Sequence, residues 1–303
     1  MLLVDYFMDR RNGFEKVITT DCSPYAPALY HSSNHYIVPP MNAPGYIQTI
    51  IDICSKEEIN AVLPLQEEEL LLISKNIGLF KKKGIIPIIS DYNTVERCKD
   101  KYQFSRYLSD LGISTVPTYS QEEIIEKEEI IFPLYVKPRF GAGSIANSII
   151  ADKDSFIKLI KEKQIEFIGQ PILKGQEYGV NAYLDIHSNK LIDYFILKKL
   201  AMRAGETFKS VSIHNAEINA LLNKLCKAIS FRGPIDLDII EENGVYYILE
   251  INPRFGGGYP HTYNCGINFP KYIANNISGE LLQRFTSYKD DVVALRYTDI
   301  IIV

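Results

Sequence analysis

The chain has 303 residues, of which 46% are hydrophobic, and its formal net charge at pH 7 is -4. This length and hydrophobic content suffice to bury one large core or two to three smaller ones, which favours a compact protein of enzyme size over a small module. Lysine and arginine are spread along the chain, so the field that recruits nucleic acid or an anionic membrane is missing, and neither partner is expected.

The cysteines and the apolar runs indicate a cellular compartment. Five cysteines lie far apart without a CxxC pair, which argues against a thiolate zinc site and a disulfide framework: Cys22, Cys54, Cys98, Cys226 and Cys265. No apolar run approaches the roughly 18 residues that a membrane-spanning helix needs. The sequence therefore predicts a cytoplasmic protein without a signal peptide or a membrane segment.

Apolar, β-branched runs alternate with amphipathic stretches through the first hundred residues. Strands are predicted at 17–20, 36–38, 61–65 and 85–89, and helices at 45–55 and 67–83. Such alternation is typical of βαβ units and a parallel sheet. Residues 2–7 have helical spacing where a doubly wound unit normally opens with a strand, so that first strand is expected to be absent.

The pattern changes after a predicted helix at 91–110. Strand then follows strand, which indicates an antiparallel region. Strands are predicted at 134–137, 145–150, 167–172, 178–184, 191–197, 235–240 and 246–251, with helices at 154–163 and 216–231. A domain boundary between residues 93 and 115 follows from this change.

A lysine ends one predicted strand and precedes a glycine-rich loop. Lys137 is followed by Gly141, Gly143 and Ser144. Glycines let backbone N–H groups close on phosphate oxygens, and the lysine supplies a positive charge for them. The lysine precedes the glycines, so the loop is not a Walker motif, and a Gly-Ala-Gly hairpin taken alone is usually only a turn.

Acidic and amide residues interrupt two apolar strands farther along the chain. The segment 233–238 reads Gly-Pro-Ile-Asp-Leu-Asp, and the segment 246–258 contains Glu250 and Asn252. A buried carboxylate is costly unless a cation neutralises it. Mg²⁺ is typically held by one or two carboxylates together with substrate phosphates, so Asp238, Glu250 and Asn252 are candidate ligands.

The spacing of these residues makes a specific structural prediction. Asn243-Gly244 is the dipeptide of a two-residue hairpin turn, which would place Asp238 opposite Leu249. For Asp238 to face Glu250, the hairpin needs an odd-length loop or a bulge. Arg254 lies just beyond, where a guanidinium could clamp a transferred phosphoryl group.

These motifs resemble the ATP-grasp superfamily, and within it the synthetase domains of the carbamoyl-phosphate synthase large subunit. The resemblance runs from residue 21 to about 277 and is densest at 249–254, following 233–238 at this distance. It implies an α/β and α+β fold: an N-terminal Rossmann-like pre-ATP-grasp domain at 1–95, a small (lid) lobe with its leading helix at 96–175, and a C-terminal lobe with the metal site at 176–303.

The resemblance also implies cofactors and site residues. The cofactors would be ATP and Mg²⁺, with Mn²⁺ as an alternative metal. Lys101 and Lys137 would contact the nucleotide and its phosphates, under a lid loop that contains Gly141, Gly143 and Ser144. The backbone of Gln170, Pro171 and Ile172 would read adenine, although relatives often carry an acid in place of Gln170, and Glu177 would hold the ribose. Asp238, Glu250 and Asn252 would bind the metal, with Arg254 on phosphate.

A cluster of basic residues flanks a predicted loop over the triphosphate. Arg203 and Lys209 are predicted to act there together with Arg254, whereas solubility explains Lys198 and Lys199 equally well.

The predicted function is an ATP- and Mg²⁺-dependent ligase. It would phosphorylate a small carboxylate to an acyl phosphate and transfer the acyl group to an amine. Two alternatives stay open: carboxy-phosphate or carbamate chemistry as in carbamoyl-phosphate synthase domains, and a non-catalytic ATP-binding sensor or scaffold. The expected partners are small-molecule carboxylate and amine substrates, and a homodimer is compatible with the sequence.

Overall fold

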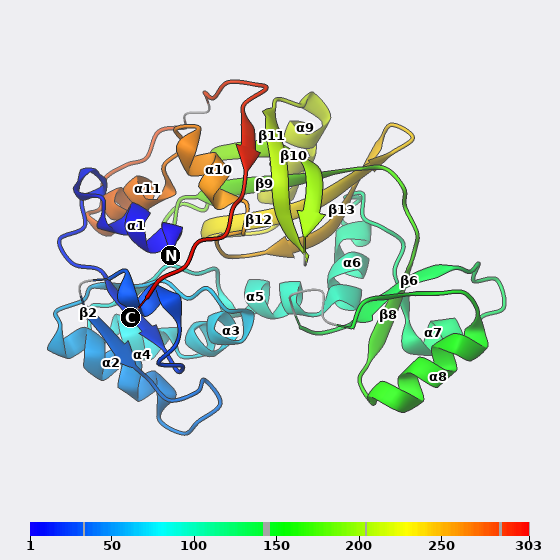
Figure 1. The fold of residues 1–303 in the computed structure, drawn as a ribbon, viewed down its shortest axis with the longest axis horizontal. Coiled ribbons are helices and arrows are strands. Elements are labelled where there is room, and N and C mark those ends of the chain that lie inside the picture. Colours follow the sequence, from blue (N-terminus) through cyan, green and yellow to red (C-terminus); the bar gives the residue numbers. More distant parts are fainter. Residues whose placement is uncertain (33, 142–145, 204, 285–286, 303) are drawn as a thin grey trace.

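A computed structural model describes residues 1–302 except 33, 142–145, 204 and 285–286 (Figure 1). Its N-terminal part contains two pairs of parallel strands, β1 with β2 and β3 with β4, as the alternating pattern predicts. The elements here are α1 (Leu2–Met8), η1 (Arg10–Asn12), β1 (Ile18–Asp21), η2 (Pro27–Tyr30), β2 (Asn34–Ile37), α2 (Tyr46–Lys56), β3 (Ala61–Val62), α3 (Glu67–Lys75), α4 (Ile77–Lys81) and β4 (Ile86–Pro87). The first element is a helix, in agreement with the spacing of the first residues.

The predicted helix at 91–110 is in fact two helices, α5 (Tyr92–Lys99) and α6 (Lys101–Asp110). Asp100 separates them because its backbone is extended and its side chain accepts a hydrogen bond from the backbone N–H of Gln103. An aspartate in this position caps the second helix. The predicted boundary at 95 falls within α5.

The small lobe is a four-stranded sheet in the order β5-β8-β6-β7, with antiparallel pairing throughout. Its elements are β5 (Tyr119–Ser120), α7 (Gln121–Glu126), β6 (Leu134–Pro138), β7 (Ser148–Ile150), α8 (Lys153–Lys163) and β8 (Phe167–Pro171). Phe156 of α8 and Ile124 of α7 are fully buried with Val136 and Phe167 of the sheet, so the two helices cover one face. This lobe lies at one end of the molecule (Figure 1).

The large sheet has six strands in the order β13-β12-β9-β10-β11-β14, all antiparallel. Its region comprises β9 (Gln176–Leu184), β10 (Leu191–Arg203), β11 (Glu206–Ile213), α9 (Ala216–Ala228), β12 (Gly233–Glu242), β13 (Val245–Asn252), α10 (Tyr259–Asn264), α11 (Phe269–Ile277) and β14 (Val293–Leu295). One face packs on α9, and the other face packs on α10 and α11. The predicted boundary at 175 coincides with the start of β9.

The loop predicted between residues 197 and 209 is shorter than expected. Strand β10 continues to Arg203 and β11 begins at Glu206, so the basic residues of this segment lie mostly on strands. Lys198 and Lys199 are adjacent there, and Leu200, Ala201 and Met202 follow one another, so the sequence lacks the polar–apolar alternation that indicates a strand.

The N-terminal helix docks on the last helices of the chain. The ring of Tyr6 stacks on Tyr263, with 3.8 Å between ring centroids. Asn12 is buried, donates from Nδ2 to the Tyr6 carbonyl oxygen at 2.6 Å, and accepts from Asn268 Nδ2 at 2.6 Å. Phe7 joins the core cluster between the large sheet and α11. Helix α1 therefore shares one hydrophobic core with α10 and α11.

Candidate active site

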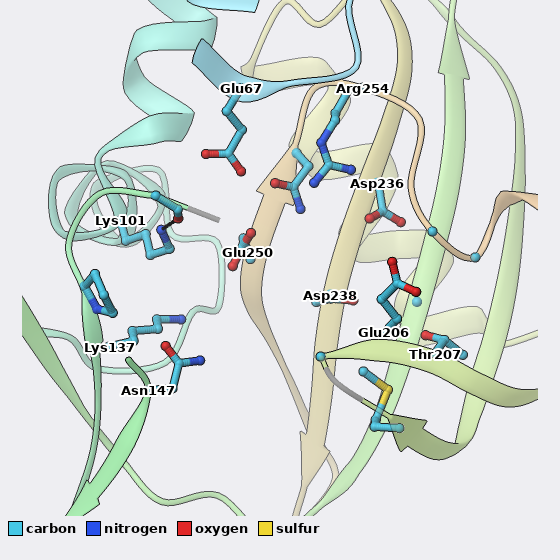
Figure 2. A pocket seen from close by; sticks show the side chains of 18 of the residues that line it. Glu67, Lys101, Lys137, Asn147, Glu206, Thr207, Asp236, Asp238, Glu250 and Arg254 are labelled. Atoms are coloured by element: carbon cyan, nitrogen blue, oxygen red, sulfur yellow. Dashed lines mark hydrogen bonds between the residues drawn. The ribbon is translucent and has the colours of Figure 1, made fainter. Parts of the chain in front are cut away.

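A cleft of about 730 Å³ lies where the N-terminal part, the small lobe and the large sheet meet (Figure 2). Several separate segments supply its walls. They are the loop before α3 with the first residue of that helix (Leu65–Glu67), the start of α6 (Lys101), the end of β6 and its loop (Lys137–Gly141), the β10–β11 hairpin (Leu197–Thr207), the β12–β13 hairpin (Asp236–Asn252) and the segment that follows it (Arg254–Gly258).

Within the part of the chain that the structure describes, no helix is long and apolar enough to cross a membrane.

The β12–β13 hairpin places four polar side chains on the cleft. Asp238 lies opposite Glu250, and Asp236 lies opposite Asn252. Residues that are directly opposite in an antiparallel pair share a face, and residues two apart on one strand do so as well. All four side chains therefore point the same way, and all four line the cleft.

The predicted bulge is confirmed. The turn at Asn243-Gly244 has two residues, both with positive φ, at 54° and 79°. The pairing then shifts by one residue, because Ile239 lies opposite Ile248 whereas Asp238 lies opposite Glu250. Leu249 is the extra residue of a β-bulge, and this extra residue brings the two carboxylates level.

Lys199 neutralises part of this acidic surface. Its Nζ is 2.6 Å from Asp238 Oδ1 and 3.4 Å from Glu177 Oε2, and its side chain is only 5% exposed. Although burial disfavours the charged form, the carboxylates of Asp238 and Glu177 hold the pKa of Lys199 above its usual value. The sequence offered solubility as an equal explanation for this lysine, and the buried contact with Asp238 favours a role in the cleft.

Asp236 has a different environment from Asp238. Burial, followed by repulsion from Asp238, raises the pKa of Asp236 to about 7, although Arg254 and Lys199 oppose this effect. The backbone of Gly256 crosses directly beside the Asp236 carboxyl group, since a Cβ added to Gly256 would lie 2.2 Å from Asp236 Cγ. A glycine is required there for steric reasons.

The opposite wall carries lysines. Lys137 is buried, and burial, with the nearby Lys101, lowers its pKa although Glu250 opposes the shift. Lys101 donates a hydrogen bond to the Gly141 carbonyl oxygen. Glu67 enters from the N-terminal part, and burial together with Glu250 raises its pKa. Two cations thus face a group of carboxylates across the cleft (Figure 2).

The structure brings together seven of the predicted site residues on the cleft: Lys101, Lys137, Gly141, Asp238, Glu250, Asn252 and Arg254. Gly143 and Ser144 lie outside the described residues. The side chain of Gln170 is buried and donates from Nε2 to Thr118 Oγ1 at 2.9 Å. Pro171 ends β8, and Ile172 follows it.

Two predicted catalytic residues do not line the cleft. Arg203 is exposed at the end of β10, with its guanidinium carbon 5.5 Å from the centroid of the Phe208 ring. Lys209 is exposed on β11, and strand alternation directs it to the face opposite its neighbour Ser210, which contacts His261. Glu206 and Thr207 of the same hairpin line the cleft instead.

The sequence analysis assigned no role to several cleft residues: Glu67, Asn147, Lys199, Glu206, Thr207 and Asp236. Alternation along β12 could have identified Asp236, because it is two residues from Asp238. Glu67 carries no such signal, because it reaches the cleft only through the packing of the N-terminal part on the rest of the chain.

Comparison with known proteins places this site in a family. A family model described as an ATP-grasp domain matches residues 98–258, and one described as a PylC-like N-terminal domain matches residues 1–89. The first match spans more than half of the chain, so the chain belongs to the ATP-grasp family. The predicted fold class and the resemblance to carbamoyl-phosphate synthase domains are thereby confirmed.

Sequence relatives include carbamoyl phosphate synthase large chains. That of Clostridium botulinum is 26% identical over 255 residues, covering 73% of this chain and 24% of the relative. That of Thermomicrobium roseum is 25% identical over 187 residues, covering 56% of this chain and 17% of the relative. The chain thus spans a quarter or less of the length of these relatives.

Solved structures establish the fold. N5-carboxyaminoimidazole synthetase from Staphylococcus aureus, complexed with ADP, superimposes with a TM-score of 0.76 at 18% identity, over 96% of this chain and 76% of that one. The biotin carboxylase domain of 2-oxoglutarate carboxylase from Hydrogenobacter thermophilus, in complex with MgADP and bicarbonate, has a TM-score of 0.75 at 16% identity, over 96% and 70%. L-amino acid ligase from Bacillus licheniformis has a TM-score of 0.70 at 17% identity, over 92% and 73%.

Proposed function

We propose that this protein is an ATP- and Mg²⁺-dependent ligase that activates a small carboxylate as an acyl phosphate and transfers the acyl group to an amine. One observation carries the proposal: Asp238, Glu250 and Asn252 lie side by side on one wall of the cleft, with Arg254 beside them and Lys101 and Lys137 on the other wall. This arrangement suits a polyphosphate that is bound between lysines and a metal ion.

The donor atoms fit magnesium. Asp238 and Glu250 offer carboxylate oxygens and Asn252 an amide oxygen, all on the same face of the hairpin. Mg²⁺ usually keeps several waters and takes further ligands from substrate phosphates, so two carboxylates and an amide suffice from the protein. Bound there, Mg²⁺ would neutralise phosphate charge as it develops during transfer.

The residues of the chain then have distinct proposed tasks. Lys101 and Lys137 bind the phosphates, and Arg254 stabilises the transferred phosphoryl group. Glu177 is 42% exposed on β9 and is proposed to hold the ribose, with the backbone of residues 170–172 beside the base. Gly141, Gly143 and Ser144 are proposed to close on the phosphates.

The reaction requires no protein nucleophile. An oxygen of the substrate carboxylate attacks the γ-phosphorus of ATP, and the bond between that phosphorus and the β,γ-bridging oxygen breaks to release ADP. The amine nitrogen then attacks the acyl carbon, the bond from that carbon to the phosphate oxygen breaks, and inorganic phosphate and a proton leave. The chain contributes positioning and charge stabilisation to both steps.

A second candidate is carboxy-phosphate chemistry with bicarbonate as the acid. The similarity to carbamoyl phosphate synthase large chains over about three quarters of this chain supports it. Bicarbonate-dependent release of phosphate from ATP, without any organic carboxylate, would distinguish this candidate from the first.

The direct test is trapping of the acyl phosphate with hydroxylamine. The protein is incubated with Mg-ATP, hydroxylamine and each of the twenty proteinogenic amino acids and a set of simple carboxylic acids, and both hydroxamate and phosphate are measured. We expect hydroxamate that depends on ATP, Mg²⁺ and one class of carboxylate. Failure of all carboxylates to yield hydroxamate would sink the proposal.

Replacing Glu250 tests whether Asp238, Glu250 and Asn252 bind a metal ion. Glu250→Gln keeps the side-chain volume but removes a charged ligand, so hydroxamate formation is expected to fall at least about 100-fold, the loss typical of removing one electrostatic stabiliser. Glu217→Gln, an exposed residue of α9, is the matched control and should retain full activity. Equal rates in the two variants would refute the metal assignment.

A further inference from the structure

The carboxylate of Asp236 is not used by the chemistry described above. It lines the cleft directly opposite Asn252, about 7 Å along the strand from Asp238. Asp238 is paired with Lys199, and Glu206 on the facing hairpin is paired with Arg296. Among the described residues, Asp236 has neither an ion-pair partner nor a hydrogen-bond partner.

A second unsatisfied polar group lies directly beside Asp236. Asn181 of β9 is opposite Asp236 in the sheet, so the two side chains share a face. Asn181 is only 1% exposed, yet its Nδ2 has no hydrogen-bond partner among the described residues. A buried donor without a partner loses its water without compensation, which calls for a ligand.

The neighbours of Asn181 show that it borders the cleft. On β9 it lies between Gly179, which lines the cleft, and Tyr183, which belongs to the core. A Cβ added to Gly258, another lining residue, would come within 3.5 Å of Asn181 Nδ2. The orphan amide therefore sits where the hydrophobic core ends and the cleft begins.

The surroundings define the chemistry of a ligand at this point. The backbone of Gly256 packs against the Asp236 carboxyl group, whereas Gly257 and Gly258 line the cleft, and a Cβ added to Gly257 would meet nothing within 4 Å. In Figure 2, Asp236 and Glu206 face one another on the side of the cleft away from Lys101 and Lys137. The Asp236 carboxylate can accept a hydrogen bond, and the neighbouring Asn181 amide can donate one. This pair matches a molecule that carries an amino group and, close to it, an oxygen.

We propose that Asp236 and Asn181 form the subsite for the acceptor substrate, and that this substrate is a cationic amine with a neighbouring oxygen, such as an amino acid. The amino group donates a hydrogen bond to the Asp236 carboxylate, and Asn181 Nδ2 donates to the oxygen. Asp236 thereby binds the amine in its protonated form, and the ammonium group releases one proton to solvent before its nitrogen attacks the acyl carbon. The inference rests on the proposed ligase function.

The test separates acceptor binding from carboxylate activation. Hydroxylamine is uncharged at neutral pH and needs no carboxylate partner, whereas alkyl amines and amino acids are protonated. With the carboxylate identified by trapping, the twenty amino acids and methylamine are added as acceptors. An acceptor is recognised because it lowers the hydroxamate yield while phosphate release continues, and its KM is then measured.

In Asp236→Asn, hydroxamate formation, the KM for ATP and the Mg²⁺ requirement should stay within about threefold of the wild type. The KM for the acceptor should rise about 10- to 100-fold, the size expected for losing a hydrogen bond to a charged group. Asp290→Asn, the same substitution at an exposed site outside the cleft, is the control and should change nothing. Should Asp236→Asn fail to fold, Asn181→Leu removes the orphan donor at similar volume and is expected to show the same split.

Each other result decides against the subsite. An unchanged acceptor KM in Asp236→Asn, or a wild type that ignores every amine, overturns it. A raised Mg²⁺ requirement would make Asp236 a metal ligand instead, and loss of hydroxamate formation would place it in the activation step. Absence of hydroxamate in the wild type overturns the proposed ligase function itself, and the acceptor subsite with it.

Discussion

Lys199 links the charge balance of the cleft to the folding stability of the protein. Its ammonium group contacts Asp238 and Glu177, two carboxylates that would otherwise lie close together without a counter-ion. In Lys199→Met the free energy of unfolding should fall by about 1–3 kcal/mol, the scale of hydrogen bonds to charged groups. Added Mg²⁺ with ATP should recover more stability in this variant than in the wild type, because the metal replaces the missing positive charge at Asp238.

Thermal unfolding with and without Mg-ATP measures both effects. Lys198→Met is the matched control, since Lys198 is the next residue on β10 and points to the other face of the sheet. Lys198 is half-buried and has no ion-pair partner among the described residues, so this change should stay within about 0.5 kcal/mol. Equal stabilisation of both variants by Mg-ATP would contradict the proposed exchange of lysine for metal.

At the scale of single residues, the sequence identifies site residues whose polarity conflicts with the apolar strands around them. Asp238, Glu250 and Asn252 interrupt apolar strands, and that conflict by itself indicates a cation. Lys199 gives no such signal, because lysines are common on exposed strands. Arg203 and Lys209 carry a charge suited to phosphate, but they are exposed and lie outside the residues that line the cleft.

At the scale of elements, the connection between the two sheets packs very closely on the β12–β13 hairpin. A Cβ added to Gly175 would lie 1.6 Å from the Glu241 carbonyl oxygen. Gly175→Ala should therefore displace the connection and lower the free energy of unfolding by about 1–3 kcal/mol, as overpacking does.

Urea unfolding checks this prediction. Gly78 of α4 is the control, because a Cβ there meets nothing within 4 Å and its φ is not positive. Gly78→Ala should raise stability by about 0.4–1 kcal/mol through reduced freedom of the unfolded chain. A Gly175→Ala variant as stable as the wild type would show that the connection adjusts without cost.

The elements themselves follow largely from local patterns. Alternation located β6, β8, β9, β12 and β13, and turn chemistry together with the acids predicted the bulge at Leu249. Strand β14 was not predicted because only three residues pair, and their partner β11 lies about eighty residues earlier. The break at Asp100 depends on a capping hydrogen bond, which competes with a helical pattern that is continuous in the sequence.

At the scale of the whole molecule, the N-terminal part and the C-terminal lobe share a core. One hydrophobic cluster combines Phe7 and Ile88 with Tyr183, Phe255 and Phe269. We retain as a proposal the division into 1–95, 96–175 and 176–303, but the shared cluster implies that the first and third parts unfold together.

Two thiols report on this coupling, that of Cys54, which is buried, and that of Cys226, which is partly buried. Burial raises the pKa of Cys54, in the N-terminal part, to about 11 and that of Cys226, on α9, to about 12. At pH 8 both are protonated in the folded protein and should react slowly with a thiol reagent, because the thiolate is the reactive form. Exposed Cys22 should react at once.

Labelling at increasing urea concentrations, in a Cys22→Ser background, gives the measurement. Cys54 and Cys226 should become reactive over the same range of urea, and mass spectrometry of peptides distinguishes them. Labelling of Cys54 at clearly lower urea would show that the N-terminal part opens on its own and that the shared cluster does not couple it to the sheet.

The bulge at Leu249 has a practical consequence for engineering. It lies between the turn at Asn243-Gly244 and the paired carboxylates. The strand pairing therefore has one register between the turn and the bulge and another, shifted by one residue, between the bulge and the cleft. The two turn residues are exposed and lie outside the residues that line the cleft. A peptide tag or a fluorescent label inserted at this tip would therefore extend into solvent and leave Asp238 and Glu250 in place on the cleft.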